Sequence, residues 1–236
     1  MNKLKTLFCA VFTLLLVNTT AHADSANFAG PYIGVSASGY GMQLDGSSRT
    51  SPTGGTHELE EVSLGQVAPV TGVEAGYAIP IGTSFLIDVG VQYFSGTAKL
   101  DYQNDDAPVT ATGTADGGDS LTAKDVSFSI DSLSTAYIQP TLVLSDTSAV
   151  YVKVGVTEAS TGVTGDVTDP GDLGGTTWAM GTRTQLDNGI FLKTEAGYTD
   201  YNGISSHGKG TSVSTDNSYS AEPTVAFGSV SLGFRF

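Results

Sequence analysis

Apolar and polar residues alternate over several stretches of this chain, with the two-residue period of a β-strand that has one apolar and one polar face. The clearest case is SVSLGFRF (229–236), where Val230, Leu232, Phe234 and Phe236 alternate with small or charged residues. Chain termini are usually polar and frayed. An apolar strand that ends on Phe236 therefore predicts an apolar surrounding for that face.

Eight segments of strand length follow one another along the sequence, and their connections alternate strictly between long and short. The short ones are PIGT, SDTS and DNG, and the last two contain residues that tolerate the positive φ of hairpin turns. In an up-and-down barrel this alternation places all short turns at one rim, as in outer-membrane barrels. We predict an all-β fold, an eight-stranded antiparallel up-and-down transmembrane β-barrel with short periplasmic turns and four long extracellular loops. The strands are predicted at 30–44, 68–79, 84–100, 125–144, 149–160, 174–186, 190–202 and 223–236.

Side-chain parity divides each predicted strand into an apolar and a polar face. In 84–100, for example, Val89 and Val91 share one face and Asp88 lies on the other. A water-soluble barrel would turn the apolar face inward, and its aromatic residues would fill the core. The one-sided loops favour the opposite arrangement, with apolar faces in contact with lipid and an aromatic girdle near the strand ends. The predicted girdle residues are Tyr32, Tyr93, Trp178, Tyr198, Phe234 and Phe236.

The first 23 residues have the three regions of a secretory signal peptide: basic MNKLK, apolar TLFCAVFTLLLV and a small-residue end in NTTAHA. We predict cleavage after Ala23, so that 1–23 is removed and 24–236 is the outer-membrane barrel domain. A retained amino-terminal anchor is the alternative, although the apolar run is short for a membrane span. Cys9 leaves with the signal peptide, so the mature chain has no disulfide.

Composition narrows the possible partners. The chain has 10 Lys and Arg against 24 Asp and Glu, a formal net charge of −14, which argues against nucleic-acid binding because that needs a basic surface. Thirty glycines, with many Thr, Ser and Val residues, are typical of an all-β chain. No cofactor is expected.

The chain resembles the small outer-membrane β-barrel proteins of the opacity, OmpX/Ail and OmpA-barrel type. The similarity covers FAGPYIGVSASGYG (28–41), the eight hairpin-connected strands and the closing GFRF (233–236). It implies residence in the bacterial outer membrane, contact with outer-membrane lipid and lipopolysaccharide, and an unknown extracellular ligand. In that family an alternating apolar strand that ends in Phe resembles the signal read by the assembly machinery. The resemblance thus assigns this role to Val230, Leu232, Phe234 and Phe236.

Charged residues on the inward faces are the strongest candidates for a functional site. Counted from the nearest short turn, and ignoring the stagger of the barrel, they fall into one layer near the short turns, where three acids meet three bases. They are expected either to plug the narrow lumen as mutual partners or to line a gated ion path. In this layer we expect Glu195 to depend on Lys193. The six residues are Glu74, Asp88, Lys153, Arg183, Lys193 and Glu195.

Other chemistry is sparse. His57 and His207 fall in predicted loops, and no Ser/His/acid set can be placed on a strand, so no enzyme is expected. A metal site joining the two histidines lacks further ligands. The acidic loops offer weak candidates for divalent cations, above all Asp166, Asp169 and Asp172, but without the spacing of a calcium-binding loop. Solvated acidic loops are the simpler interpretation.

The sequence therefore predicts a monomeric surface-exposed scaffold or adhesion protein, whose loops carry recognition and whose lumen is plugged. The alternative is a narrow porin-like channel for ions or small solutes through the charged lumen. Loop deletion would abolish binding under the first hypothesis and leave conductance intact under the second.

Overall fold

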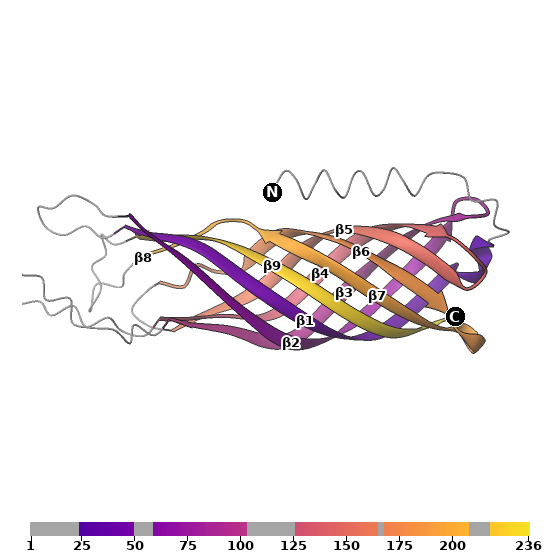
Figure 1. The fold of residues 1–236 in the computed structure, drawn as a ribbon, viewed down its shortest axis with the longest axis horizontal. Coiled ribbons are helices and arrows are strands. Elements are labelled where there is room, and N and C mark those ends of the chain that lie inside the picture. Colours follow the sequence, from indigo (N-terminus) through magenta and orange to yellow (C-terminus); the bar gives the residue numbers. More distant parts are fainter. Residues whose placement is uncertain (1–23, 50–58, 103–125, 165–167, 208–217) are drawn as a thin grey trace, which may run out of the picture.

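The computed structural model describes residues 24–49, 59–102, 126–164, 168–207 and 218–236, which form a single elongated barrel (Figure 1). No helix in these ranges is long and apolar enough to cross a membrane. The described helices are two single 3-10 turns, η1 (Ser25–Asn27) and η2 (Asp187–Gly189). The strands are β1 (Gly30–Arg49), β2 (Leu59–Pro80), β3 (Phe85–Tyr102), β4 (Val126–Val143), β5 (Ser148–Thr164), β6 (Leu173–Gln185), β7 (Ile190–Tyr201), β8 (Ile204–His207) and β9 (Ser218–Arg235).

Every long strand pairs antiparallel with its neighbours, and β9 pairs with both β7 and β1, which closes the barrel. The predicted eight-stranded up-and-down barrel is thereby confirmed. A path of paired residues that leaves β1 at Ile33 goes once round the barrel and returns to β1 at Gln43, a stagger of ten residues. Eight staggered strands enclose a lumen just wide enough for side chains.

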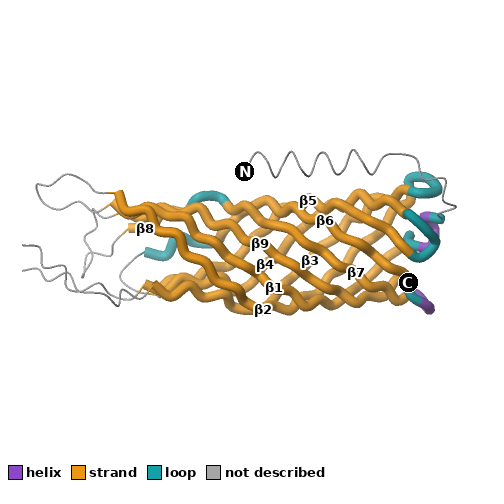
Figure 2. Tube along the Cα trace, viewed as in Figure 1, coloured by secondary structure: helices purple, strands orange, loops and turns teal. Residues whose placement is uncertain are grey.

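The two ends of the barrel differ. Residues 81–84, 144–147 and 186–189 make the short connections, and Figure 2 shows them together at the end where the chain terminates. In the last of them Asn188 adopts a left-handed φ of 61°, which asparagine tolerates. We call the end of the barrel with the short connections the turn end, and the opposite end the loop end.

At the loop end the strands extend beyond their predicted limits. β2 begins at Leu59 and not at 68, and β9 begins at Ser218 and not at 223. The interval 203–222, predicted as a loop, contains β8, which pairs with the outer part of β9. The β2 extension, LEEVSLGQ, lacks the strict alternation that identified the other strands.

The outward face of the barrel is apolar, as side-chain parity predicts. Val35, Val73, Val91 and Leu232 are all more than half exposed on this wall. Among the predicted girdle residues, Tyr93, Phe234 and Phe236 are exposed, and Trp178 and Tyr198 are half-buried on the same outward parity. The prediction for Tyr32 was wrong: its ring is 2% exposed and lies in the lumen, where its hydroxyl meets that of Tyr137 at 2.9 Å.

Large aromatic rings in the lumen lie over glycines on neighbouring strands. A Cβ added at any of these glycines would come within 3 Å of the ring that lies over it. The register thus pairs each ring with a residue that has no side chain. The directly paired partners are Tyr32 and Gly76, Phe94 and Gly72, Tyr137 and Gly90, Tyr151 and Gly181, Phe191 and Gly233, Tyr201 and Gly175, and Phe227 and Gly197.

We expect Gly72→Ala to lower the free energy of unfolding by about 1–3 kcal/mol, because the added methyl group would lie 2.5 Å from the Phe94 ring. Gly39→Ala is the matched control, since nothing lies within 4 Å of its Cβ position, and it should be neutral or slightly stabilising. Urea unfolding in lipid vesicles, followed by the fluorescence of the single tryptophan, measures both. Equal effects of the two variants would contradict the close-packed lumen.

Candidate functional site

The structure places all six predicted charges inside the barrel. They come from five strands: β2, β3, β5, β6 and β7. Each is less than a tenth exposed, and Asp88 and Lys153 are fully buried. The inward residues of alternating positions on these strands provide the site. Because a buried charge without a partner is costly, the contacts between them decide what the site can do.

The six charges form three ion pairs. Lys193 Nζ lies 2.7 Å from Glu74 Oε2, on the opposite side of the lumen, and Lys153 Nζ lies 2.5 Å from Glu195 Oε2. The expected dependence of Glu195 on Lys193 was therefore wrong. These two residues lie two positions apart on β7 and point the same way, so each pairs with a residue of another strand instead.

The third pair, between Arg183 and Asp88, is looser. Arg183 Nη1 lies 3.8 Å from Asp88 Oδ1, which is too long for a hydrogen bond. The other carboxylate oxygen of Asp88 accepts hydrogen bonds from Thr141 Oγ1 at 2.6 Å and Gln139 Nε2 at 2.9 Å. Neutral donors thus hold this carboxylate alongside the cation.

Gln92 joins the other two pairs. Its Nε2 donates to Glu74 Oε2 at 3.4 Å, and its Oε1 accepts from Lys153 Nζ at 2.9 Å. Tyr151 donates its hydroxyl to Glu195 at 3.0 Å. Four charges, one amide and one phenol thus form a connected network across the lumen, which polarises and orders its members.

Aromatic faces surround the cations. Arg183 Cζ lies 4.2 Å from the centroid of Phe191 and 5.1 Å from that of Tyr32, while Lys153 Nζ lies 4.4 Å from the centroid of Tyr137. Cation–π contacts of this length favour a desolvated cation by about 2 kcal/mol or more. The site therefore binds its own cations and leaves little room for a foreign ion.

Apolar residues close the lumen on both sides of the charges. The lower apolar cluster, at the turn end, consists of Phe28, Tyr32, Ala78, Leu86, Val143, Ala149 and Phe191. The upper apolar cluster, toward the loop end, consists of Tyr40, Met42, Val70, Phe94, Phe128, Ile130, Leu133, Ala159, Leu173, Ala179, Tyr201, Val225 and Phe227.

The upper apolar cluster is tightly packed. A void lined by Tyr40, Met42, Val70 and Leu133, among others, measures about 10 Å³, at the limit for one water molecule. Sequence reasoning did not identify this cluster. The signal that could have found it lies at the inward positions of each strand. Toward the loop end the residues at these positions change from polar to apolar, as at Phe94 on β3.

A row of four threonines lies across β4 to β7. The hydroxyls of Thr135 and Thr157 are 2.8 Å apart, those of Thr157 and Thr177 are 2.5 Å apart, and those of Thr177 and Thr199 are 2.7 Å apart. All four side chains are buried. Each hydroxyl can donate to one neighbour and accept from another, so the row satisfies itself without water.

The other predicted ligands that the structure describes do not come together. Asp169 and Asp172 are exposed, and Asp169 accepts a hydrogen bond from the backbone of Gly171 at 2.9 Å. Asp166 and His57 lie outside the described residues, and His207 is exposed in β8. Within the described ranges no group of three or more His, Cys, Asp or Glu side chains could hold a metal ion.

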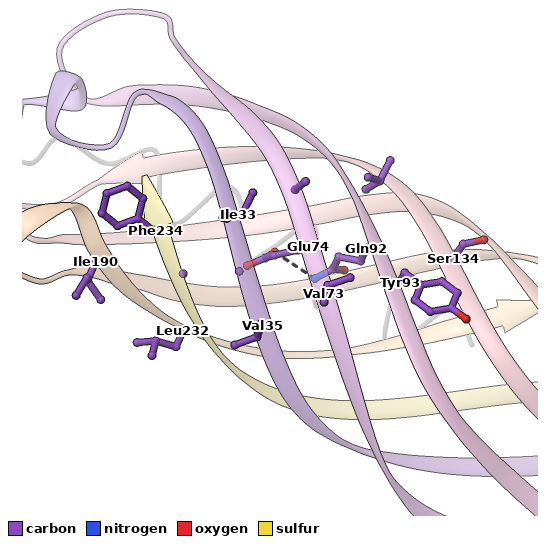
Figure 3. A pocket seen from close by; sticks show the side chains of 14 residues that line it. Ile33, Val35, Val73, Glu74, Gln92, Tyr93, Ser134, Ile190, Leu232 and Phe234 are labelled. Carbon is purple, nitrogen blue, oxygen red and sulfur yellow. Dashed lines mark hydrogen bonds between the residues drawn. The ribbon is translucent and has the colours of Figure 1, made fainter. Parts of the chain in front are cut away.

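A shallow apolar groove of about 790 Å³ lies along the outer wall (Figure 3). Val35, Val73 and Leu232 line it from outside, whereas Glu74 and Gln92 point toward each other on the lumen side. Since its outward lining is apolar, the groove belongs to the lipid-facing wall and adds no polar site. Three of the four predicted assembly residues lie on the outward face of β9, and the fourth, Phe236, directly follows this strand. The ring centroids of Phe234 and Phe236 are 5.1 Å apart. The four assembly residues are Val230, Leu232, Phe234 and Phe236.

The geometry is that of a closed membrane barrel, with an apolar wall and a polar, self-paired interior. The family model described as "Outer membrane protein beta-barrel domain" matches residues 10–236. The chain belongs to this outer-membrane barrel family. It is a protein of the bacterial outer membrane, in contact with membrane lipid.

Several solved outer-membrane proteins are similar to this chain at low sequence identity, and OprG shares its fold. OprG from Pseudomonas aeruginosa is 13% identical, with 93% of this chain and 100% of that chain covered and a TM-score of 0.54. Neisserial surface protein A is 11% identical (88% and 98% covered, TM-score 0.47), and the protease OmpT from Escherichia coli is 8% identical (88% and 97%, 0.48). No curated protein matches the chain. At these identities the likeness describes the fold alone.

Proposed function

We propose that this outer-membrane barrel is a non-enzymatic scaffold at the cell surface, whose lumen is plugged and whose extracellular part carries recognition. The observation that supports the plug is that the six buried charges pair with one another, in a layer that lies between the two apolar clusters. Each cation has an acid within 4 Å. In a conducting lumen the charged side chains exchange partners with passing ions. Here the charged side chains already form ion pairs with one another.

The loop end supports the second half of the proposal. β1 and β2 continue in register to the pair Arg49 and Leu59, while β6 and β7 end at Leu173 and Tyr201. At the loop end, β1 and β2 therefore extend past β6 and β7. Loops on a rigid scaffold commonly carry binding functions, so adhesion or contact with an extracellular ligand is the role that this geometry favours.

The proposal has consequences for partners and for the oligomeric state. Outer-membrane lipid and lipopolysaccharide would cover the apolar wall, and the assembly machinery would read the outward residues at the end of the chain. The barrel would remain a monomer because its wall is apolar on all sides. The candidate assembly residues are Val230, Leu232, Phe234 and Phe236.

Single-channel conductance of the refolded mature protein in a planar bilayer tests the plug. We expect no openings above the baseline from the wild type, because paired charges and both apolar clusters close the path. The gel mobility of the folded form confirms that the inserted protein is a barrel. A Lys153→Ala/Glu195→Ala variant removes one pair and serves as the comparison.

Reproducible wild-type openings that the double variant alters would overturn the plug. They would favour the narrow channel, with the charged layer as its gate. A silent wild type, by contrast, would direct the search for function to the extracellular loops.

A further inference from the structure

Residues 24–29, between the predicted cleavage site and β1, lie across the turn end of the barrel. Asp24 caps η1, since its Oδ1 accepts a hydrogen bond from the backbone of Ala26 at 2.9 Å. Ser25 binds the β2–β3 turn twice. Its backbone N–H donates to the Thr83 carbonyl at 2.7 Å, and its hydroxyl donates to the Gly82 carbonyl at 2.5 Å.

The same segment contacts the other strand ends at this mouth. Gln185 Nε2, at the end of β6, donates to the carbonyl of Asn27 at 2.8 Å. Arg235 Nη1, at the end of β9, donates to the carbonyl of Ala29 at 3.0 Å. The segment is thus held by three separate parts of the rim: the β2–β3 turn, the end of β6 and the end of β9.

Phe28 is the residue that enters the barrel. Its side chain is fully buried in the lower apolar cluster, and its ring centroid lies 5.8 Å from the guanidinium carbon of Arg183. It therefore lies between the turn end and the loosest ion pair, Arg183 and Asp88, where water from the periplasm would first reach the charges.

Cleavage changes the chemistry of the first residue. Hydrolysis of the Ala23–Asp24 bond consumes one water, leaves a carboxylate on Ala23, and leaves on Asp24 an α-amine that is mostly protonated at neutral pH. The Asp24 nitrogen lies 3.4 Å from Oδ1 of Asp146, in the β4–β5 turn. A neutral amide that donates one hydrogen bond thus becomes an ammonium group beside a carboxylate.

We propose that residues 24–29 are a stopper of the periplasmic mouth, and that removal of the signal peptide completes it. The new ammonium group of Asp24 pairs with Asp146 and holds the segment, so that Phe28 seals the charged layer from the periplasm. The proposal rests on the predicted cleavage site and goes beyond the plug, which concerns the charges and not their cover.

Thiol accessibility tests the seal. The mature chain has no cysteine, so Ala78→Cys, a buried position of the lower apolar cluster, gives a single reporter. We expect a charged, water-soluble thiol reagent to label the refolded reporter protein slowly, and at least tenfold faster after Phe28→Ala or when the chain starts at Gly30. Phe94→Ala, the same truncation in the upper apolar cluster, is the matched control and should leave the rate unchanged.

Equal labelling rates with and without Phe28, in barrels of normal gel mobility, would overturn the stopper. If the chain that starts at Gly30 does not fold, the Phe28→Ala comparison alone decides. The result is separate from conductance: a silent wild type with unchanged labelling would refute the stopper and leave the plug intact.

The role of cleavage is tested at the amine itself. Acylation of the Asp24 amine by an amine-specific reagent, read by mass spectrometry of the amino-terminal peptide, should be about two- to fivefold faster after Asp146→Asn, the range for an exposed ion pair. Asp187→Asn removes an exposed acid from the neighbouring turn and should have no effect. Equal rates in all three proteins would show that Asp146 does not hold the new terminus.

Discussion

Replacing Lys193 with methionine is expected to lower the free energy of unfolding by about 3–5 kcal/mol, the largest effect of any single change considered for this barrel. Lys193 Nζ lies 2.7 Å from Glu74 Oε2, and both side chains are almost completely buried. Methionine has a similar length, so it would leave little cavity. The loss would come from the carboxylate of Glu74, which would remain buried with only the amide of Gln92 as a donor.

Leu192→Met is the matched control. Leu192 precedes Lys193 on β7 and points outward, so the same new side chain would face lipid and cost less than about 1.5 kcal/mol. Urea unfolding in lipid vesicles, with Trp178 fluorescence as the signal, measures both variants. Similar stabilities of the two proteins would mean that Glu74 finds water or another partner, and the closed lumen would then be wrong.

Leu232→Arg is expected to destabilise the barrel by about 1–4 kcal/mol, the cost of a cation on the lipid-facing band. Leu232 is half exposed on β9, and its paired neighbours Val35 and Leu192 face the same way. An arginine at this place would face lipid, as its neighbours do. The same unfolding measurement in vesicles of defined thickness quantifies the loss.

Val67→Arg separates membrane burial from mere exposure. Val67 is 76% exposed, more than Leu232, but it lies on the part of β2 beyond its last pair with β3, toward the loop end. There an arginine can reach water, and we expect a cost of about 0–1 kcal/mol. If the two arginines cost the same, the outward apolar face does not define the membrane-spanning band.

The existence and parity of the strands could be predicted because one face of each contacts lipid and the other contacts the lumen. This contrast gives the two-residue period from Ile87 to Val91. The four residues of β8, ISSH, are too few to show this period, and there the prediction failed. Tyr32 was misplaced for another reason: its position near a strand end assigned it to the girdle, whereas its parity, opposite to that of Ile33 and Val35, places it in the lumen.

The inward charges could be identified from parity, but their partners could not. The choice of Glu74 for Lys193, and of Glu195 for Lys153, depends on the ten-residue stagger and on the width of the lumen, which no single strand encodes. The same is true of the rings that lie over glycines, such as Phe94 over Gly72, because each pair joins two strands. Register is a property of the closed barrel.

The central claim is that the buried charges neutralise one another in a closed lumen. A double-mutant cycle over Lys193→Met, Glu74→Gln and the double variant, with free energies of unfolding measured in the same vesicles, tests it most directly. We predict a coupling energy of about 2–3 kcal/mol, because removal of the second partner costs little once the first is gone. Additive losses, with a coupling within about 0.5 kcal/mol of zero, would show that water or ions solvate each charge independently, and would contradict the plug.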